Sequence, residues 1–544
     1  MIKQPASIFN DVIGPIMRGP SSSHVAAANR IGNLVRQMVK GKLKDVIVEF
    51  DPKGSLATTY HGHGSDMGLV GGLLGLDPTD DRLPKSLELA VQQGINVSFK
   101  VVDYPAKHPN TYRMTLISDK EEIIHLTAIS VGGGMIEIQE IEGFEVSIAG
   151  DFYETLVFVD DVDEAELKQK NETIITLIRG FDFCDYTVNN RHGLIDIKTG
   201  YKLPVEVINQ IEKIGQVKNV VQIAPVLPIM SRKDCVVPFR SAEEMLRVAS
   251  SEKNLQLWEL AAMYESARGG ISQQEVFDKM KDIVVLMESS IKAGLKGTSY
   301  EDRILGPQAY LIEKNKSKLI PGDVVNKAIS YITSMMEVKS SMGVIVAAPT
   351  AGAAGGLPGT IIGAATVMGF NIDDMTKAML AAGIIGVFIA EKSGFAAEVG
   401  GCQLECGAGG GMAAAGLVQL VDGSAEQGVD AVSIALQNIL GLICDPVGDR
   451  VEWPCLGRNI MAGVNAIASA NMALAGYDKV VPLDETLTAM DEVGKMLPSE
   501  LRCTGLGGLS VTPTSKKIYN ELKLRAKKKL MKVDEVLRQN AYKN

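Results

Sequence analysis

The chain lacks the excess of basic residues that nucleic-acid-binding proteins usually carry. Its 544 residues include 55 Lys and Arg against 65 Asp and Glu, which gives a net charge of −10. Because nucleic acid is bound largely through positive charge, this balance argues against nucleic acid as the main partner. Basic residues do gather at the end, where residues 516–544 hold ten Lys and Arg and three Asp and Glu. We interpret this tail as a solvated amphipathic helix rather than a phosphate-binding arm.

The chain also lacks an obvious segment for export or for membrane insertion. Its first nine residues contain no apolar stretch of signal-peptide length. One uncharged run, between Lys339 and Asp373, is long enough to raise the question of a membrane span. That run contains Pro349, Pro358 and seven glycines, so we interpret it as buried loop and helix. We therefore expect a cytoplasmic protein that makes no membrane contact.

Aromatic residues are scarce at 5%, whereas 46% of the residues are hydrophobic and 55 are glycine. A chain of this length is too long for one compact core and predicts several domains. Many of the glycines lie between Gly343 and Gly423. Clustered small residues favour tight helix contacts or a backbone that comes close to a ligand.

The pattern of expected elements indicates a multidomain protein. Residues 1–150 mix helical and strand patterns, which predicts an α+β domain. Residues 154–224 follow the βαββαβ order of a ferredoxin-like module, which could sense an amino acid or serve only as a spacer or dimerisation element. Residues 225–243 form a linker to a predominantly α-helical domain, predicted over residues 244–515. The basic helix of residues 516–544 follows it.

Seven cysteines are present, and five of them lie after residue 400. In a chain without an export signal we do not expect a disulfide framework, so thiols concentrated in one region suggest a metal or cluster site. Cys402, Cys444 and Cys455 form the strongest set. Their spacing is too wide for a short-spaced zinc finger or a ferredoxin motif, and by itself shows only that three thiols could converge.

Short motifs surround these cysteines and recur along the chain. The cysteine contexts are Gly400-Gly-Cys-Gln-Leu-Glu405, Gly441-Leu-Ile-Cys-Asp-Pro446 and Val451-Glu-Trp-Pro-Cys-Leu-Gly-Arg-Asn459. The others are Gly19-Pro-Ser-Ser-Ser-His24, Gly54-Ser-Leu-Ala57, Gly62-His-Gly-Ser-Asp66, His108-Pro-Asn-Thr111, Gly132-Gly-Gly134, Ala348-Pro-Thr-Ala-Gly-Ala-Ala-Gly355 and Gly507-Gly-Leu-Ser-Val-Thr-Pro513. In type and order these segments resemble the iron–sulfur-dependent L-serine dehydratases, also called L-serine ammonia-lyases. The resemblance covers nearly the whole chain, with a β-type region followed by an α-type region.

This resemblance implies a specific cofactor and reaction. Cys402, Cys444 and Cys455 would hold a [4Fe–4S] cluster and leave one iron open to the substrate L-serine. The open iron would act as a Lewis acid on the hydroxyl group, and a base would remove the Cα proton, so that pyruvate and ammonia form. The resemblance also leads us to expect a homodimer, with residues 154–224 as an ACT-like module.

The chain departs from parts of the family in two places. Some members end in a cysteine that caps the open iron, whereas residues 540–544 include no cysteine. Cys406 and Cys503 are the local candidates for a substitute, and each could equally be a small buried hydrophobe, so neither is assigned as a ligand. The Pro-Gly pair common after the first strand of ACT-like modules is missing from residues 160–164, which argues against effector binding.

Two of the six histidines, His63 and His108, match the two motif histidines of the family. His63, between two glycines, is the first candidate for the base, and His108 is the second, because an imidazole titrates in the range that proton transfer requires. His125 and His192 lie outside any motif and are expected to be structural. His61 is left as a possible neighbour of the site.

The segment of Ser21, Ser22, Ser23 and His24 is expected to open a helix after Pro20. Free backbone N–H groups and hydroxyls there would suit a substrate carboxylate, although one serine could merely cap the helix. Further polar partners for the substrate are expected at the following positions: Asn110, Thr350, Arg458 and Asn459.

Several other functions fit parts of the sequence. L-threonine dehydration or sulfide elimination from L-cysteine would use the same scaffold. A non-catalytic amino-acid sensor with a structural metal would be expected to lack a motif histidine or a cluster cysteine, and all are present. A pyridoxal-phosphate enzyme would need a lysine in a recognisable anchoring segment, which we do not find.

Overall fold

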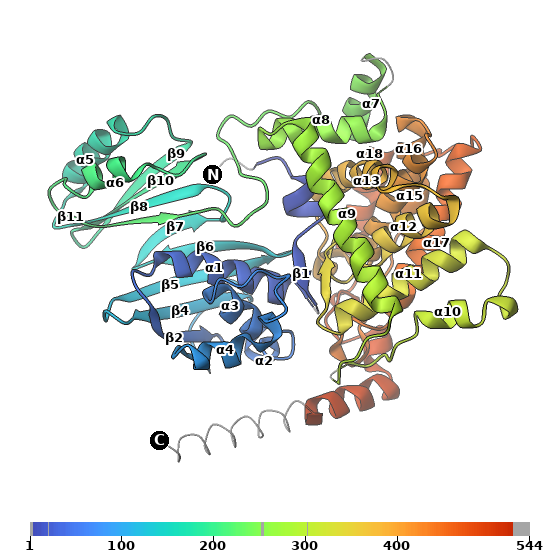
Figure 1. The fold of residues 1–544 in the computed structure, drawn as a ribbon, viewed down its shortest axis with the longest axis horizontal. Helices are drawn as coiled ribbons and strands as arrows, with labels where there is room; N and C mark the ends of the chain where they lie inside the picture. Colours follow the sequence, from blue (N-terminus) through green and yellow to red (C-terminus); the bar gives the residue numbers. More distant parts are fainter. Residues whose placement is uncertain (1–3, 20, 252–254, 302, 526–544) are drawn as a thin grey trace.

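A computed structural model describes residues 4–19, 21–251, 255–301 and 303–525 of the chain. Figure 1 shows two sheet-containing parts on the left and a large helical part on the right. The multidomain α+β architecture expected from the sequence is confirmed, with a sheet-rich N-terminal region and a helical C-terminal region.

The N-terminal part is a six-stranded sheet with helices against it. Its strands lie in the order β3-β2-β4-β5-β6-β7, and only the β2–β3 pair is parallel. The strands are β2 (Leu43–Phe50), β3 (Asn96–Val101), β4 (Thr111–Ser118), β5 (Ile123–Gly132), β6 (Met135–Ile141) and β7 (Phe144–Ile148). The main helices are α1 (Ala27–Met38) and α3 (Ser65–Leu73). Two shorter helices, α2 (Leu56–Thr59) and α4 (Ser86–Gln92), belong to the same part.

Helix α1 buries the apolar side chains that the sequence pattern placed on one face, namely Ile31, Leu34, Val35 and Met38. It lies very close to α3, because a Cβ at Gly72 would come within 2.1 Å of the Asn29 carbonyl oxygen. Glycine is therefore required where the two helix backbones meet. This contact fixes the loops at the N-terminal ends of both helices, which carry His24 and His63.

The middle module has the expected βαββαβ order. Its elements are β8 (Tyr153–Asp160), α5 (Glu164–Thr176), β9 (Phe183–Asn189), β10 (His192–Thr199), α6 (Val205–Ile211) and β11 (Val217–Ile223). The sheet order is β11-β8-β10-β9, and every pair is antiparallel. A cavity of about 440 Å³ lies between this module and the six-stranded sheet, with Phe144, Phe158 and Lys218 in its lining. An ACT-like role for the module stays a prediction.

The C-terminal part consists of helices around an apolar core. They are α7 (Ala242–Ser251), α8 (Leu257–Gly269), α9 (Gln273–Leu295), α10 (Tyr310–Lys314), α11 (Asp323–Ser340), α12 (Gly356–Met368), α13 (Ile372–Lys392), α14 (Ala397–Gly400), α15 (Ala408–Leu420), α16 (Ala425–Gln437), α17 (Cys455–Leu474) and α18 (Leu483–Met496). Residues 513–525 are also helical, and residues 526–544 of the predicted basic tail lie outside the described residues. The uncharged run after Lys339 forms a short strand, a loop and helix α12, as expected. In the described part of the chain, every helix is too short or too polar to span a membrane.

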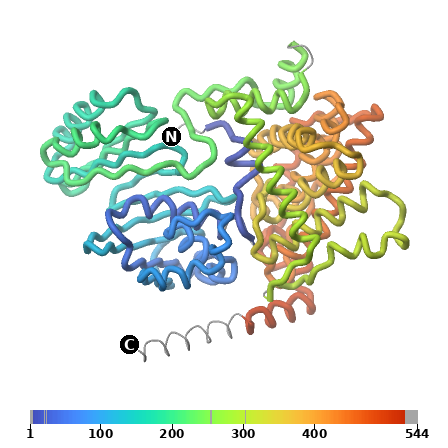
Figure 2. Tube along the Cα trace, viewed as in Figure 1, coloured from blue at the N-terminus to red at the C-terminus, as the bar shows by residue number. Residues whose placement is uncertain are grey.

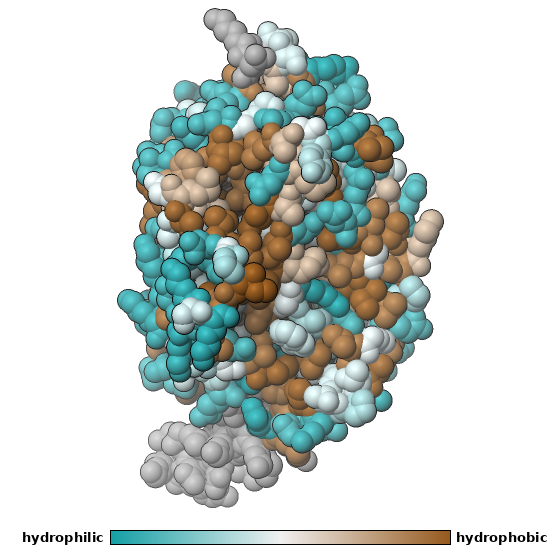
Figure 3. Space-filling model, turned by 90° about the vertical axis from the view of Figure 1, so that its right-hand side faces the viewer, coloured by the Kyte–Doolittle hydropathy of each residue, from teal (hydrophilic) through white to brown (hydrophobic). Residues whose placement is uncertain are grey.

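Figure 3 shows that hydrophobic residues gather on the outer face of the helical part. Exposed apolar surface of this kind is common where subunits meet. The homodimer stays a prediction, and this face is the first place to look for its interface.

An N-terminal arm, residues 5–19, packs into the helical part rather than into the neighbouring sheet domain. Figure 2 shows this dark-blue segment running along the helices before the chain enters the sheet. Ile8 and Val12 are completely buried in the helical core. The buried carboxylate of Glu265 accepts hydrogen bonds from the Ser7 hydroxyl (2.5 Å) and the Ile8 N–H (2.8 Å). The pattern of the sequence did not predict this arm.

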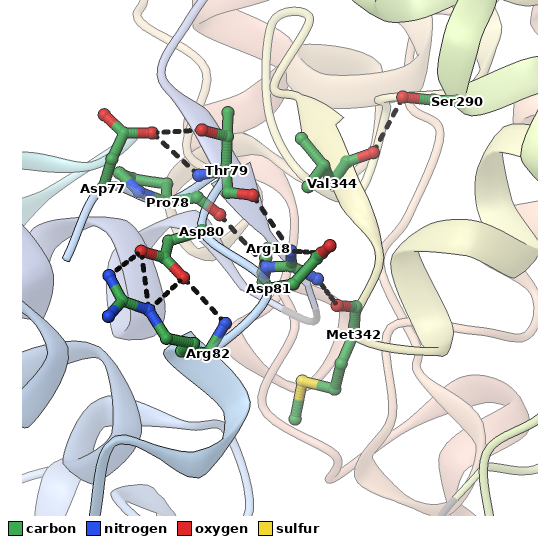
Figure 4. A network of polar contacts seen from close by, with 10 residues as sticks. All are labelled: Arg18, Asp77, Pro78, Thr79, Asp80, Asp81, Arg82, Ser290, Met342 and Val344. Atoms are coloured by element: carbon green, nitrogen blue, oxygen red, sulfur yellow. Dashed lines mark hydrogen bonds and ion pairs between the residues drawn. The ribbon is translucent and has the colours of Figure 1, made fainter. Parts of the chain in front are cut away.

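After the arm, β1 (Ile16–Arg18) pairs antiparallel with β12 (Val344–Val346) of the helical part. The Arg18 side chain makes further contacts between the sheet domain and the helical part (Figure 4). Its guanidinium donates to the carbonyls of Pro78 (3.1 Å), Thr79 (3.1 Å) and Met342 (3.2 Å) and pairs with Asp81 (2.6 Å). One side chain thus joins a loop of the sheet domain to the helical part.

We predict that Arg18→Met loosens this junction. The variant should lose about 1.5–3 kcal/mol of stability, because removal of the buried guanidinium leaves three carbonyls without their hydrogen bonds. Hydrogen–deuterium exchange should rise in residues 77–82 and 342–346. Arg82→Met is the matched control, since Arg82 is exposed and bonds Asp80 two residues away. Equal exchange in both variants would contradict the junction role of Arg18.

Candidate functional site

Five cysteine thiols lie together inside the helical part. Cys402 precedes the π-helical turn η5 (Gln403–Gly407), which carries Cys406, and Cys455 is the first residue of α17. The Cys402 thiol lies within hydrogen-bonding distance of the Cys406 and Cys444 thiols. Cys444 is also within hydrogen-bonding reach of Cys503, and Cys455 is near enough to interact electrostatically with Cys402 and Cys503. All seven cysteines of the chain are free of disulfides.

Backbone hydrogen bonds bring these segments together. The Cys444 N–H donates to the Leu501 carbonyl, and the Cys503 N–H donates to the Cys444 carbonyl, each over 2.8 Å. Cys503 has a φ of +62°, a left-handed conformation that is uncommon for a residue other than glycine. Gly401, with a φ of +76°, lies against the Leu442 carbonyl, where a Cβ would approach to 2.6 Å. The thiols therefore meet because of contacts between residues distant in sequence.

The surroundings shift the pKa values of these thiols in different directions. Hydrogen bonds from Cys406 and Cys444 hold the pKa of the Cys402 thiol well below its ordinary value. Arg458 adds to this effect, since one guanidinium nitrogen lies 3.5 Å from the Cys402 sulfur. Burial raises the pKa of the Cys455 thiol. Cys402 is therefore the cysteine most readily deprotonated before any metal arrives.

Glu405 is a site residue that the sequence reasoning missed. One of its oxygens and the sulfurs of Cys402 and Cys444 lie within 4.8 Å of one another, which is a spacing that could hold a metal ion. The Thr350 hydroxyl donates to this carboxylate over 2.8 Å, and burial raises the pKa of Glu405 to about 8. The only signal in the sequence was the position of Glu405, three residues after Cys402.

Asn459 and Arg458 lie at the start of α17, and both contact the site. Asn459 is completely buried, and its side chain donates to the Gly352 and Cys455 carbonyls, each over 2.8 Å. Arg458 pairs with Asp445 at 2.5 Å. Asn459 thus ties the loop after Thr350 to the cysteine-bearing helix. Substrate contacts of Asn459 and Arg458 stay predictions.

His24 and His63 lie together in the sheet domain. Their rings make an edge-to-face contact with centroids 4.6 Å apart. His24 bonds the Ser21 hydroxyl (2.9 Å) through Nδ1 and the Thr59 hydroxyl (3.3 Å) through Nε2. Ser21 makes no side-chain capping bond to the helical turn η2 (Ser22–Ala26), so its hydroxyl serves His24 instead. Ser22 is buried, and the side chain of Ser23 lies outside the described residues.

His63 faces the segment between two of the cysteines. Asp449 and Arg450 act on the pKa of its ring, and the Arg450 guanidinium donates to the Gly62 carbonyl over 3.0 Å. Its Nδ1 is buried and has no hydrogen-bond partner in the described part of the chain. Burial lowers the pKa of His63. A neutral imidazole with an unpaired nitrogen is suited to accept a proton.

His108 and Asn110 form a neighbouring loop of the sheet domain. The Asn110 N–H donates to His108 Nδ1 over 3.1 Å, and the Ser55 hydroxyl donates to the Asn110 side chain. The Ser55 carbonyl in turn accepts from the Thr59 hydroxyl (2.6 Å), which also bonds His24. This chain of contacts connects His108 to the histidine pair. In the described residues no hydrogen bond or ring contact joins it directly to His63.

Comparisons with known proteins match both halves of the chain. The family model of the serine dehydratase alpha chain matches residues 252–510, and that of the serine dehydratase beta chain matches residues 12–141. The L-serine dehydratase alpha chain of Peptoniphilus asaccharolyticus is 37% identical over 284 residues, which cover 52% of this chain and 97% of the relative. A probable L-serine dehydratase beta chain of Bacillus subtilis is 45% identical over 155 residues, covering 28% of this chain and 69% of the relative. The L-serine dehydratase of Streptomyces coelicolor is 26% identical over 504 residues, covering 91% of this chain and 96% of the relative.

We predict that His24 makes the protein sensitive to acid. Burial lowers the pKa of His24 to about 3 from 6.5, so only the unfolded chain takes up this proton as the pH falls below 6.5. Stability should therefore drop on acidification, by up to about 1.4 kcal/mol per pH unit for this group. His24→Gln should show a smaller fall in melting temperature between about pH 7 and about pH 5. His125→Gln, at an exposed histidine, is the control, and an unchanged pH dependence in His24→Gln would refute the prediction.

Proposed function

We infer that this chain, which belongs to the serine dehydratase family, is a carbon–oxygen lyase that converts L-serine to pyruvate and ammonia. Relatives named L-serine dehydratase align with 91% of the chain, and they cover both the sheet domain and the helical part. The observation that carries the proposal is the buried group of thiols, together with the hydrogen bond from Arg450, between Cys444 and Cys455 in sequence, to the Gly62 carbonyl beside His63 (3.0 Å). This contact supports a site that combines a metal-binding group and a base.

We further propose that Cys402, Cys444 and Cys455 hold a [4Fe–4S] cluster. The donor set fits this group, since soft thiolates bind iron–sulfur clusters and the thiols here are buried, free and close together. When bound, the cluster would supply a Lewis acid that helps the substrate hydroxyl leave. The lowered pKa of Cys402 supports the proposal, because metal binding requires deprotonated cysteines.

The loop from Ser21 to His24 is proposed to bind the substrate carboxylate. It opens the helical turn η2, whose N-terminus would present backbone N–H groups to an anion, and the Ser21 hydroxyl makes no capping bond. Asn110 lies in the adjacent loop of the same domain. The remaining polar contacts would come from the helical part, through Thr350, Arg458 and Asn459.

His63 is proposed to remove the Cα proton. Its Nδ1 is buried without a hydrogen-bond partner among the described residues, so this nitrogen can accept a proton. Loss of the proton and of hydroxide from serine would give aminoacrylate, which tautomerises to an imine that water hydrolyses to pyruvate and ammonia. His108 is the second candidate for this role, although its contacts lie within its own loop.

The proposed function predicts iron and turnover together. Wild-type protein reconstituted anaerobically with iron and sulfide should turn brown and release ammonia from L-serine faster than from L-threonine or L-cysteine. Cys402→Ser, Cys444→Ser and Cys455→Ser should each lose iron and activity, because three thiolates are needed to hold the cluster. Cys184→Ser, in the middle module, should keep both.

Iron and sulfide per chain, electron paramagnetic resonance with and without serine, and ammonia release measure these outcomes. A variant that retains the full cluster removes its cysteine from the ligand set. Turnover of threonine or cysteine without turnover of serine would refute the substrate assignment.

For the base, His63→Ala should keep wild-type iron content while kcat falls roughly 10²–10⁴-fold, the range that general base catalysis contributes. The reason is that the substitution removes the proton acceptor and leaves the thiols untouched. His125→Ala, at an exposed histidine, is the control. Turnover close to the wild-type rate in His63→Ala would transfer the base role to another residue.

A further inference from the structure

Lys339, in the last turn of α11, is one of the largest side chains that are completely buried. Its ammonium donates a hydrogen bond to the Val451 carbonyl, in the segment that leads to Cys455. Gly19 packs against the Lys339 backbone so tightly that a Cβ there would overlap the Lys339 carbonyl oxygen. Lys339 therefore lies between the thiols and the segment that leads into the proposed carboxylate-binding loop.

The surroundings of this ammonium are negatively charged or can become so. Burial lowers the pKa of Lys339, and the groups that oppose this and favour its charged form are, in decreasing order of strength, Cys455, Glu452, Glu405 and Cys406. Among the described residues, Lys339 forms a hydrogen bond to a carbonyl but no ion pair with a carboxylate. Burial of a cation without an ion pair is costly, so its counter-charge must come from groups slightly farther away.

Arg458, the other cation in the pocket, does not fill the same role. Its guanidinium lies 3.5 Å from the Cys402 sulfur but is already paired with Asp445 at 2.5 Å. The Arg458 charge is thus shared between the Asp445 carboxylate and the Cys402 thiol. Lys339, in contrast, is a completely buried cation with no carboxylate partner among the described residues.

We propose that Lys339 is the charge-compensating residue of the metal centre, with its ammonium fixed at the Val451 carbonyl to offset the negative charge of Cys455 and its neighbours. The inference rests on the proposed function, because the cysteines become anionic when they bind metal. A fixed cation nearby favours the reduced cluster over the oxidised one, since reduction adds negative charge.

Lys339→Met tests the proposal, because methionine has a similar length and no charge. Full-length wild type, Lys339→Met, Lys339→Arg and Lys327→Met would be reconstituted anaerobically with iron and sulfide. Lys327 is the matched control, since it lies on the same helix and is partly exposed. The readouts are iron per chain, the rate of iron loss to a chelator, and the midpoint potential from a redox titration followed by electron paramagnetic resonance.

Lys339→Met is expected to lose iron several-fold faster and to show a more negative midpoint potential, whereas Lys339→Arg and Lys327→Met should stay close to wild type. Wild type that takes up no iron would overturn the proposed function and this inference with it. Wild type that loads normally beside a Lys339→Met variant of equal potential and equal iron release would overturn only the role of Lys339. If Lys339→Met does not fold, Lys339→Arg decides, because a folded variant that keeps its charge and still loses iron contradicts charge compensation.

Discussion

The buried group of five thiols depends on one constraint, which is the cost of negative charge in a buried pocket. Thiols that bind a metal must lose their protons, and burial opposes that loss unless cations or hydrogen-bond donors lie nearby. The pocket supplies both, through the Arg458 guanidinium at Cys402 and the Asn459 amide at Cys406. The buried carboxylate of Glu452 adds to the negative charge, yet two backbone N–H groups satisfy it. Polar and charged groups around buried thiols support the proposed metal site over a packed apolar core.

The chemistry also depends on where the two parts of the chain meet. In the proposed site, the sheet domain carries His24 and His63 and the helical part carries the five thiols, so neither part alone would supply all of the proposed residues. The β1–β12 pair, Arg18 and the bond from Arg450 to Gly62 connect them. Because Arg450 lies between Cys444 and Cys455 in sequence, the contact that positions the His63 loop also belongs to the cysteine region. The contact between Arg450 and Gly62 thus helps to hold the two parts together and also positions the His63 loop.

Local features of this structure could be predicted from the sequence, because they arise from neighbouring residues. The apolar stripe of α1 has helical spacing, and the βαββαβ order of the middle module follows from alternating patterns and turns. Cys402, Cys444 and Cys455 stood out through the short motifs around them. The hydroxyl of Ser21 is a different case, since the sequence favoured substrate binding, with helix capping as the alternative, whereas in the structure this hydroxyl bonds His24 three residues along the chain.

The features that the sequence did not reveal all depend on contacts between distant segments. Lys339 is one of 55 basic residues, and nothing near it in sequence distinguishes it. Its proposed role follows from its interactions with Val451 and Cys455, which only the fold brings close. The N-terminal arm is a similar case. The beta-chain family model begins at residue 12, yet Ile8 and Val12 fill the core of the part matched by the alpha-chain model. The family models divide the chain by sequence, whereas packing divides it at β1, so the two matched regions form one interlocked structure.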